Sequence, residues 1–145
     1  MLIQQLATYT GLSEAEIGRL LALSPAEIYD DPAYLALIPL LDEETLKATA
    51  AQVQELYGEH LPALKDKHQL GGSIMSSYTL VNWVLGFLMY PERLRDMLNY
   101  HRRLSAEQVG AMLPDLFALL GDLEEGREAW ETALAVISLP LLATG

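Results

Sequence analysis

The chain has 145 residues, of which 51% are hydrophobic and 20% charged, so its composition is that of a folded domain and not of a disordered segment. Its formal net charge is −11, a sign that repels nucleic-acid phosphate and anionic membrane surfaces. It contains no cysteine, which excludes disulfides, thiolate metal sites and cysteine nucleophiles and is typical of a cytoplasmic protein.

Two serines near the N-terminus mark the starts of two short helices. Ser13 is followed three residues later by Glu16, and Ser24 is followed by Glu27 at the same spacing. In this capping box the hydroxyl accepts from a backbone N–H of the first turn while the acid reaches back to the backbone of the serine. Pro25 suits the first helical position, where no N–H is needed. The pattern predicts two helices joined by a tight turn.

The stretch from Leu12 to Asp31 resembles the helix-turn-helix superfamily in its apolar and small residues. The matching positions are Ile17, Gly18, Leu21, Ala22, Leu23, Ser24 and Ile28. The resemblance implies the shape of that motif. It does not extend to its chemistry, because the second helix carries Glu27, Asp30 and Asp31 where a DNA reader presents basic or amide side chains to the bases. A DNA-associated regulator, or a mimic of DNA charge, is therefore our second hypothesis.

Acidic residues are concentrated in the first part of the chain. Residues 1–60 contain ten acidic residues and only two basic ones, Arg19 and Lys47, whereas residues 61–145 contain ten acidic and seven basic residues. Asp42 is placed to cap a helix over about 43–59. The inward stripe of this helix is Leu46, Ala50, Val53, Leu56, Tyr57 and His60.

The stretch 71–90 contains no charged residue and comes close to the length of a membrane span. Its serines, a threonine and an asparagine favour instead a helix near 73–90 that is buried at the centre of a bundle. Four of its residues are candidates for a small-ligand pocket or a dimer seam, with core packing as the default interpretation. They are Tyr78, Asn82, Trp83 and Gly86.

A helix predicted over 91–103 carries most of the arginines. Its basic residues are Arg93, Arg95, Arg102, Arg103 and His101. They are candidates for binding an acidic partner or an anion. Pairing with the acidic residues of the same chain is the simpler interpretation, and we favour it.

Two further helices complete the predicted fold. A third capping box at Ser105 precedes an apolar stripe with helical spacing from Val109 to Leu120, after which Gly121 suits a left-handed C-terminal cap. The last helix is predicted over 123–138, ended by Pro140. No alternating strand pattern and no linker occurs. We therefore predict one all-α domain over 1–145, a bundle of six to eight helices around the helix near 73–90.

No catalytic or metal-binding motif is found. His60, His68 and His101 lack the spacing of zinc or di-iron sites, and neither a nucleophile elbow nor a phosphate loop occurs. We expect a non-enzymatic protein without a cofactor or metal that acts through a protein partner or self-association, with a homodimer favoured. A small-ligand or metal-binding helical bundle is the third hypothesis.

Overall fold

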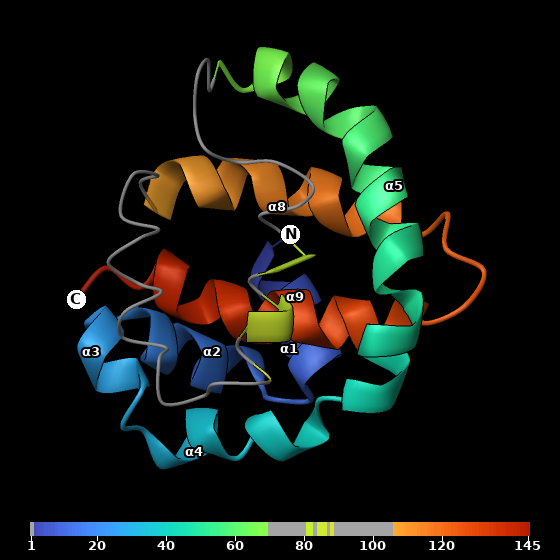
Figure 1. Cartoon of the computed structure of the whole chain (residues 1–145). Helices are drawn as coiled ribbons and strands as arrows, with labels where there is room; N and C mark the ends of the chain where they lie inside the picture. Colours follow the sequence, from blue (N-terminus) through green and yellow to red (C-terminus); the bar gives the residue numbers. More distant parts are fainter. Residues whose placement is uncertain (1, 70–80, 83, 87, 89–105) are drawn as a thin grey trace.

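The computed structural model describes residues 2–69, 81–82, 84–86, 88 and 106–145. The secondary structure of these residues is helical and includes no strand, which confirms the predicted all-α class (Figure 1). The elements are α1 (Leu2–Thr10), α2 (Glu14–Leu21), α3 (Pro25–Ile28), α4 (Pro32–Leu35), the 3₁₀ turn η1 (Ile38–Leu40), α5 (Glu43–Lys67), α8 (Ala106–Leu120) and α9 (Arg127–Leu142).

Helix α9 lies at the centre of the described helices. It packs against α8 on one side and against α1, α2 and α3 on the other, while α5 crosses near its N-terminal end (Figure 1). The eight consecutive residues 133–140 are all buried. A helix that is buried all round supplies apolar surface to every neighbour, so α9 organises the core.

The central position of α9 was not predicted from the sequence, which pointed to another helix. The helix predicted near 73–90 lies largely outside the described residues, so its central position stays a prediction. Of the residues described there, Val81 and Val84 are buried, whereas Asn82 is helical and exposed. The burial of α9 is not evident from its sequence, because the helix contains the charged residues Arg127, Glu128 and Glu131. One of these, Glu131, is only 6% exposed.

Helix α9 continues through Pro140, so the predicted end of the last helix was wrong. Proline has no N–H, which leaves the carbonyl of Val136 without its helical donor. The hydroxyl of Tyr34 replaces that donor with a bond of 2.9 Å in the buried interior. Helix α9 therefore ends at Leu142 and packs the apolar residues around Pro140 into the core.

The predicted left-handed glycine was also wrong. Gly121 does not have a positive φ, whereas Gly126 has a φ of 78° and precedes the first residue of α9. A Cβ at Gly126 would stand 2.8 Å from the hydroxyl oxygen of Thr49. That oxygen accepts a 2.7 Å hydrogen bond from the indole N–H of Trp130. The close approach of the loop to α5 therefore requires glycine at this position.

Helix α5 begins at the predicted residue, Glu43, and ends at Lys67, eight residues beyond the predicted end. Asp42 caps it by accepting from the backbone N–H of Thr45 at 3.1 Å. The helix then continues past residue 59 and through Pro62 to Lys67. The hydroxyl of Tyr57 donates to the carbonyl of Leu116 in α8 at 3.1 Å, which ties the two helices together.

The predicted stripe of α8 is confirmed in full. Its six members are Val109, Met112, Leu113, Leu116, Phe117 and Leu120, and all are buried. The capping serine predicted at Ser105 lies outside the described residues. Spacing alone locates this helix because its inward face is uniformly apolar.

Candidate functional site

The two N-terminal capping motifs build the predicted helix and turn. The hydroxyl of Ser13 accepts from the N–H of Glu16 at 3.1 Å, and Ser24 and Glu27 form both bonds of a capping box. The second helix, α3, is a single turn of four residues. It is too short to present the row of base-contacting side chains that a recognition helix carries into a major groove.

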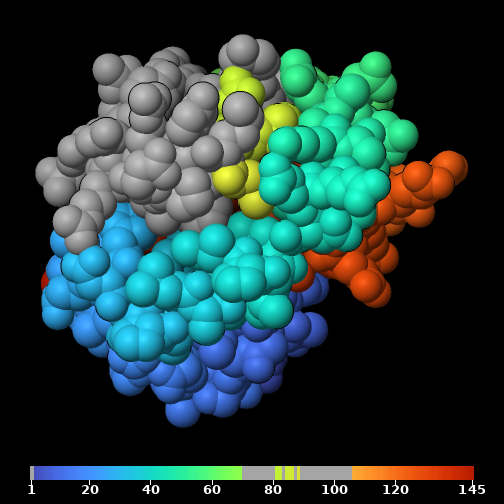
Figure 2. Space-filling view, turned by 60° about the horizontal axis from the view of Figure 1, so that its bottom comes forward, coloured from blue at the N-terminus to red at the C-terminus, as the bar shows by residue number. Residues whose placement is uncertain are grey.

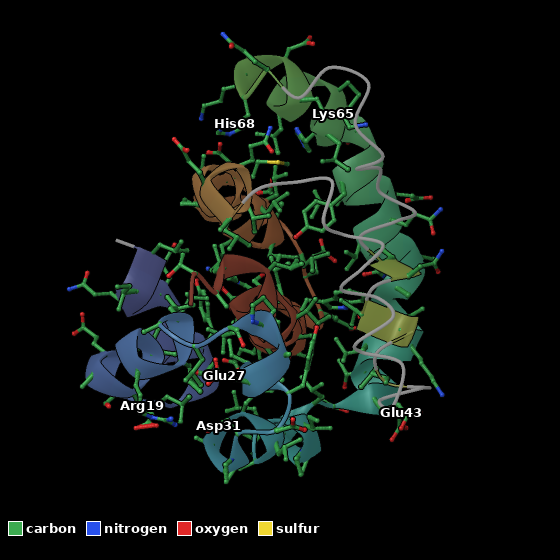
Figure 3. All side chains as sticks on the ribbon, turned by 90° about the vertical axis from the view of Figure 1, so that its left-hand side faces the viewer. Arg19, Glu27, Asp31, Glu43, Lys65 and His68 are labelled. Carbon is green, nitrogen blue, oxygen red and sulfur yellow. The ribbon has the colours of Figure 1, made fainter. Side chains whose placement is uncertain are left out.

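The one cation of this region is committed to internal ion pairs. Arg19 donates to both carboxylate oxygens of Asp31, at 2.8 and 3.0 Å, and to Glu16 at 2.6 Å (Figure 3). These guanidinium hydrogen bonds lower the pKa of Asp31 to about 2. Asp31 also caps α4 by accepting from the N–H of Ala33. The arginine therefore joins α2 to the start of α4 instead of facing a ligand.

The segment that follows Asp31 contains ten residues without a charge. Residues 32–41 read PAYLALIPLL, and the backbone keeps a helical course from α4 through Ala36 and Leu37 into η1. One face of this segment enters the core through Tyr34 and Leu37, which are 0% and 2% exposed. The hydroxyl of Tyr34 donates to the carbonyl of Val136 in α9, and burial of the two side chains determines which residues face outward.

The outward face of this segment is apolar as well. Leu35 is 44% exposed and Leu40 is 59% exposed. Between them Ala36 and Pro39 are also exposed. We name these four residues the α4–η1 ridge. The solvent face of an amphipathic helix normally carries polar residues, and grouped exposed apolar residues mark interaction surfaces.

Acidic residues border the ridge in the sequence on both sides. No Lys, Arg or His occurs from Leu20 to Leu46, a span that contains six acidic residues. Figure 3 shows Asp31 and Glu43 on the two sides of the segment. Of these six, Glu43 pairs with Lys47 at 2.7 Å and Asp31 pairs with Arg19 at 2.8 Å. The face that carries the segment is turned toward the viewer in Figure 2.

Two open hollows lie between α5 and the segment that joins α8 to α9. One hollow has a volume of about 580 Å³, and its charged lining residues are Asp42, Glu124, Arg127 and Glu128. The other, of about 340 Å³, is bordered by Glu55, Glu59, Asp122 and Glu124. Within the described part of the chain no group of three His, Asp or Glu residues is arranged to hold a metal ion.

Two of the three histidines considered for metal binding, His60 and His68, lie among the described residues. His60 lies partly buried on α5. His68 follows the last turn of α5, and its Nε2 lies 2.7 Å from a carboxylate oxygen of Asp115 in α8, which Lys67 also contacts at 3.0 Å. The bonds from His68 and Lys67 lower the pKa of Asp115. This cluster joins the end of α5 to α8.

Most of the site residues predicted from the sequence lie outside the described residues. These are Arg93, Arg95, Arg102, Arg103, His101, Tyr78 and Trp83. Asn82 is exposed, and Gly86 is partly buried with open space where a Cβ would stand. Sequence reasoning missed the ridge, although a signal was present. Ten uncharged residues between two acidic groups mark an apolar segment, although the sequence does not show which of them are exposed.

No family model, curated protein or solved structure matches the chain. Among the described residues no helix is both long enough and apolar enough to cross a membrane.

Proposed function

We propose that this chain is a non-enzymatic cytoplasmic interaction module that binds a protein partner through the α4–η1 ridge. The observation that carries the proposal is the exposure of Leu35 and Leu40, at 44% and 59%, on an outward face that contains no charged residue. Covering such a face removes apolar surface from water, which is the main source of free energy in protein association.

A protein fits this ridge better than a nucleic acid or an anionic lipid surface. The acidic residues on both sides of the ridge repel phosphate groups, and Arg19 is held by Asp31 and Glu16. Apolar side chains within a charged border are typical of protein interfaces, where the border sets specificity and the apolar centre supplies affinity.

The test replaces the two exposed leucines and compares the variant with a matched control. The double variant Leu35→Ser/Leu40→Ser removes the apolar face. Ile3→Ser removes another exposed apolar side chain, 37% exposed on α1. Each tagged protein is used to capture partners from its native cells, and mass spectrometry compares the captured proteins. We expect a partner that the wild-type chain and Ile3→Ser retain and the double variant loses.

Unfolding measurements separate loss of binding from loss of fold. Because both leucines are exposed, the double variant should keep the thermal midpoint of the wild type to within a few degrees. In contrast, Leu37→Ala removes a buried side chain and should cost about 2–5 kcal/mol. Equal capture by the wild type, Ile3→Ser and the double variant would overturn the proposal. Sedimentation of the wild-type chain tests the predicted self-association independently.

A further inference from the structure

We infer that residues 143–145 form a detachable clasp, which caps helix α2 through backbone hydrogen bonds and holds the turn between α2 and α3. The clasp is a conformational device and uses none of the ridge residues, so it does not depend on the proposed function. Three features of the molecule support it. They are the hydrogen bonds at the end of α2, the space around Gly145, and the exposure of the clasp itself.

Helix α2 ends without the left-handed residue that commonly closes a helix. Its C-cap residue, Ala22, is right-handed, with a φ of −81°. The N–H of Ala22 donates to the carbonyl of Gly18 at 3.2 Å. The N–H of Leu23 donates to the carbonyl of Leu20 at 3.1 Å. The carbonyl of Leu21 is one of the last four of the helix, so its donor must come from outside the helix.

Residues 144 and 145 supply that donor and a second one for the turn. The N–H of Thr144 donates to the carbonyl of Leu21 at 3.0 Å, and the hydroxyl of Thr144 donates to the same oxygen at 3.2 Å. The N–H of Gly145 donates to the carbonyl of Leu23 at 3.1 Å. Figure 1 shows this end of the chain beside α3. The cap of α2 is thus completed across a sequence separation of 123 residues.

The fit of Gly145 against the turn leaves no room for a side chain. A Cβ at this position would collide with the carbonyl oxygen of Ala22 and would stand 2.6 Å from the carbonyl carbon of Leu23. Both are backbone atoms, which cannot turn aside as the end of a flexible side chain can. Closure of the clasp on the turn therefore requires glycine at position 145.

The clasp has no buried side chain of its own. Thr144 and Gly145 are exposed and Ala143 is partly buried, whereas Leu142 directly before them is only 8% exposed. The backbone becomes extended at Ala143, with a ψ of 136°. Exposed hydrogen bonds contribute only modestly to stability because water can replace them, and such segments open while the core stays folded. The clasp therefore opens beyond Leu142 and releases the turn without unfolding α9.

A proline at position 144 tests the clasp. Thr144→Pro removes the N–H that donates to Leu21, and the residue before a proline prefers the extended backbone that Ala143 already has. Thr144→Ala is the matched control, because it removes the hydroxyl and keeps the N–H. Amide hydrogen exchange is measured residue by residue by NMR in the full chain of the wild type and of both variants.

We expect Thr144→Pro to speed the exchange of the Ala22 and Leu23 amides about tenfold, and Thr144→Ala to speed it less than about threefold. The amides of α8 should change by less than about twofold in both variants, because the core stays folded when the clasp opens. Gly145→Ala should reproduce the effect of the proline, since its added Cβ meets the backbone of the turn.

Three results would overturn the inference. One is unchanged exchange at Ala22 and Leu23 in Thr144→Pro, and another is an equal effect of the proline and alanine variants. The third is equal acceleration of the α8 amides, or failure of Thr144→Pro to fold, because the clasp would then be an inseparable part of the core.

Discussion

The hydroxyl of Tyr34 donates a 2.9 Å hydrogen bond to the carbonyl of Val136, the one carbonyl of α9 that Pro140 leaves without a helical donor. A buried tyrosine thus replaces a missing backbone group across a sequence separation of 102 residues. The same tyrosine anchors the inner face of the segment whose outer face is the α4–η1 ridge. Core stability and the position of the ridge therefore depend on one side chain.

Removing the Tyr34 hydroxyl should destabilise the protein. Tyr34→Phe keeps the ring but leaves the carbonyl of Val136 unpaired in the interior, which we expect to cost about 1–3 kcal/mol in the free energy of unfolding. Urea denaturation measures this loss. In a Pro140→Ala background the restored N–H can serve the same carbonyl, so there Tyr34→Phe should cost less. An equal cost in both backgrounds would contradict the assigned role of this bond.

Replacing two glycines by alanine should change the free energy of unfolding in opposite directions. Gly126→Ala forces a Cβ to within 2.8 Å of the Thr49 hydroxyl at a φ of 78°, and we expect a loss of at least about 1–2 kcal/mol. Gly18→Ala, in the exposed part of α2 with nothing within 4 Å of the new Cβ, should gain roughly 0.5–1 kcal/mol. Thermal unfolding of the two variants measures the sign of each change in stability. A stabilised Gly126→Ala would refute the close approach of Gly126 to Thr49.

The Arg19–Asp31 pair should stabilise the protein above about pH 4. The pKa of Asp31 lies at about 2 in the folded protein, below its ordinary value of 3.8, because of the hydrogen bonds from Arg19. A lowered pKa contributes stability above the unfolded value, and this contribution is lost as the pH falls from about 4 toward about 2. Arg19→Gln should therefore lower the urea midpoint at neutral pH and have little effect near pH 2.

An exposed pair on α5 provides the control for that measurement. Lys47→Gln breaks the pair with Glu43, whose two side chains are 50% and 55% exposed. Its effect on the urea midpoint should be smaller at every pH, because exposed pairs within a helix contribute little. If the effect of Arg19→Gln at pH 2 equals its effect at neutral pH, the arginine stabilises the protein by packing and not by charge.

The chain should not bind duplex DNA. Helix α3 is a single turn, its neighbouring acids repel phosphate, and Arg19 is occupied. We expect no shifted band in a gel-shift assay with a mixed-sequence duplex at about 10 µM protein and about 50 mM salt, conditions that favour non-specific binding. A shifted band that is lost as salt is added would revive the helix-turn-helix regulator hypothesis.

Local signals in the sequence predicted local structure well. The caps at Ser13, Ser24 and Asp42 and the stripe of α8 depend on residues within a few positions of one another, so they can be recognised without knowledge of the fold. The end of α9 depends instead on Tyr34, a distant donor that no local pattern reveals. The same holds for Gly126, whose need for glycine arises from contact with Thr49 in α5.

The candidate site was harder to predict for a related reason. An apolar run such as residues 32–41 is typical of core in a sequence, and three of its residues, Tyr34, Leu37 and Leu41, are indeed buried. Only the packing of Tyr34 and Leu37 shows that Leu35 and Leu40 must face outward. Exposure of an apolar residue is a property of the folded surface, and composition cannot distinguish it from burial.

Helix α9 follows in the chain every described helix that it packs against, and this order affects how the protein folds during synthesis. Helices α1, α2, α3, α5 and α8 are all synthesised before residues 127–142. Their inward faces then have no central helix to cover them, and such nascent surfaces are prone to aggregation and bound by chaperones. Folding is therefore completed only after α9 emerges, and a ribosome stalled before residue 127 should carry a nascent chain that proteases cleave readily.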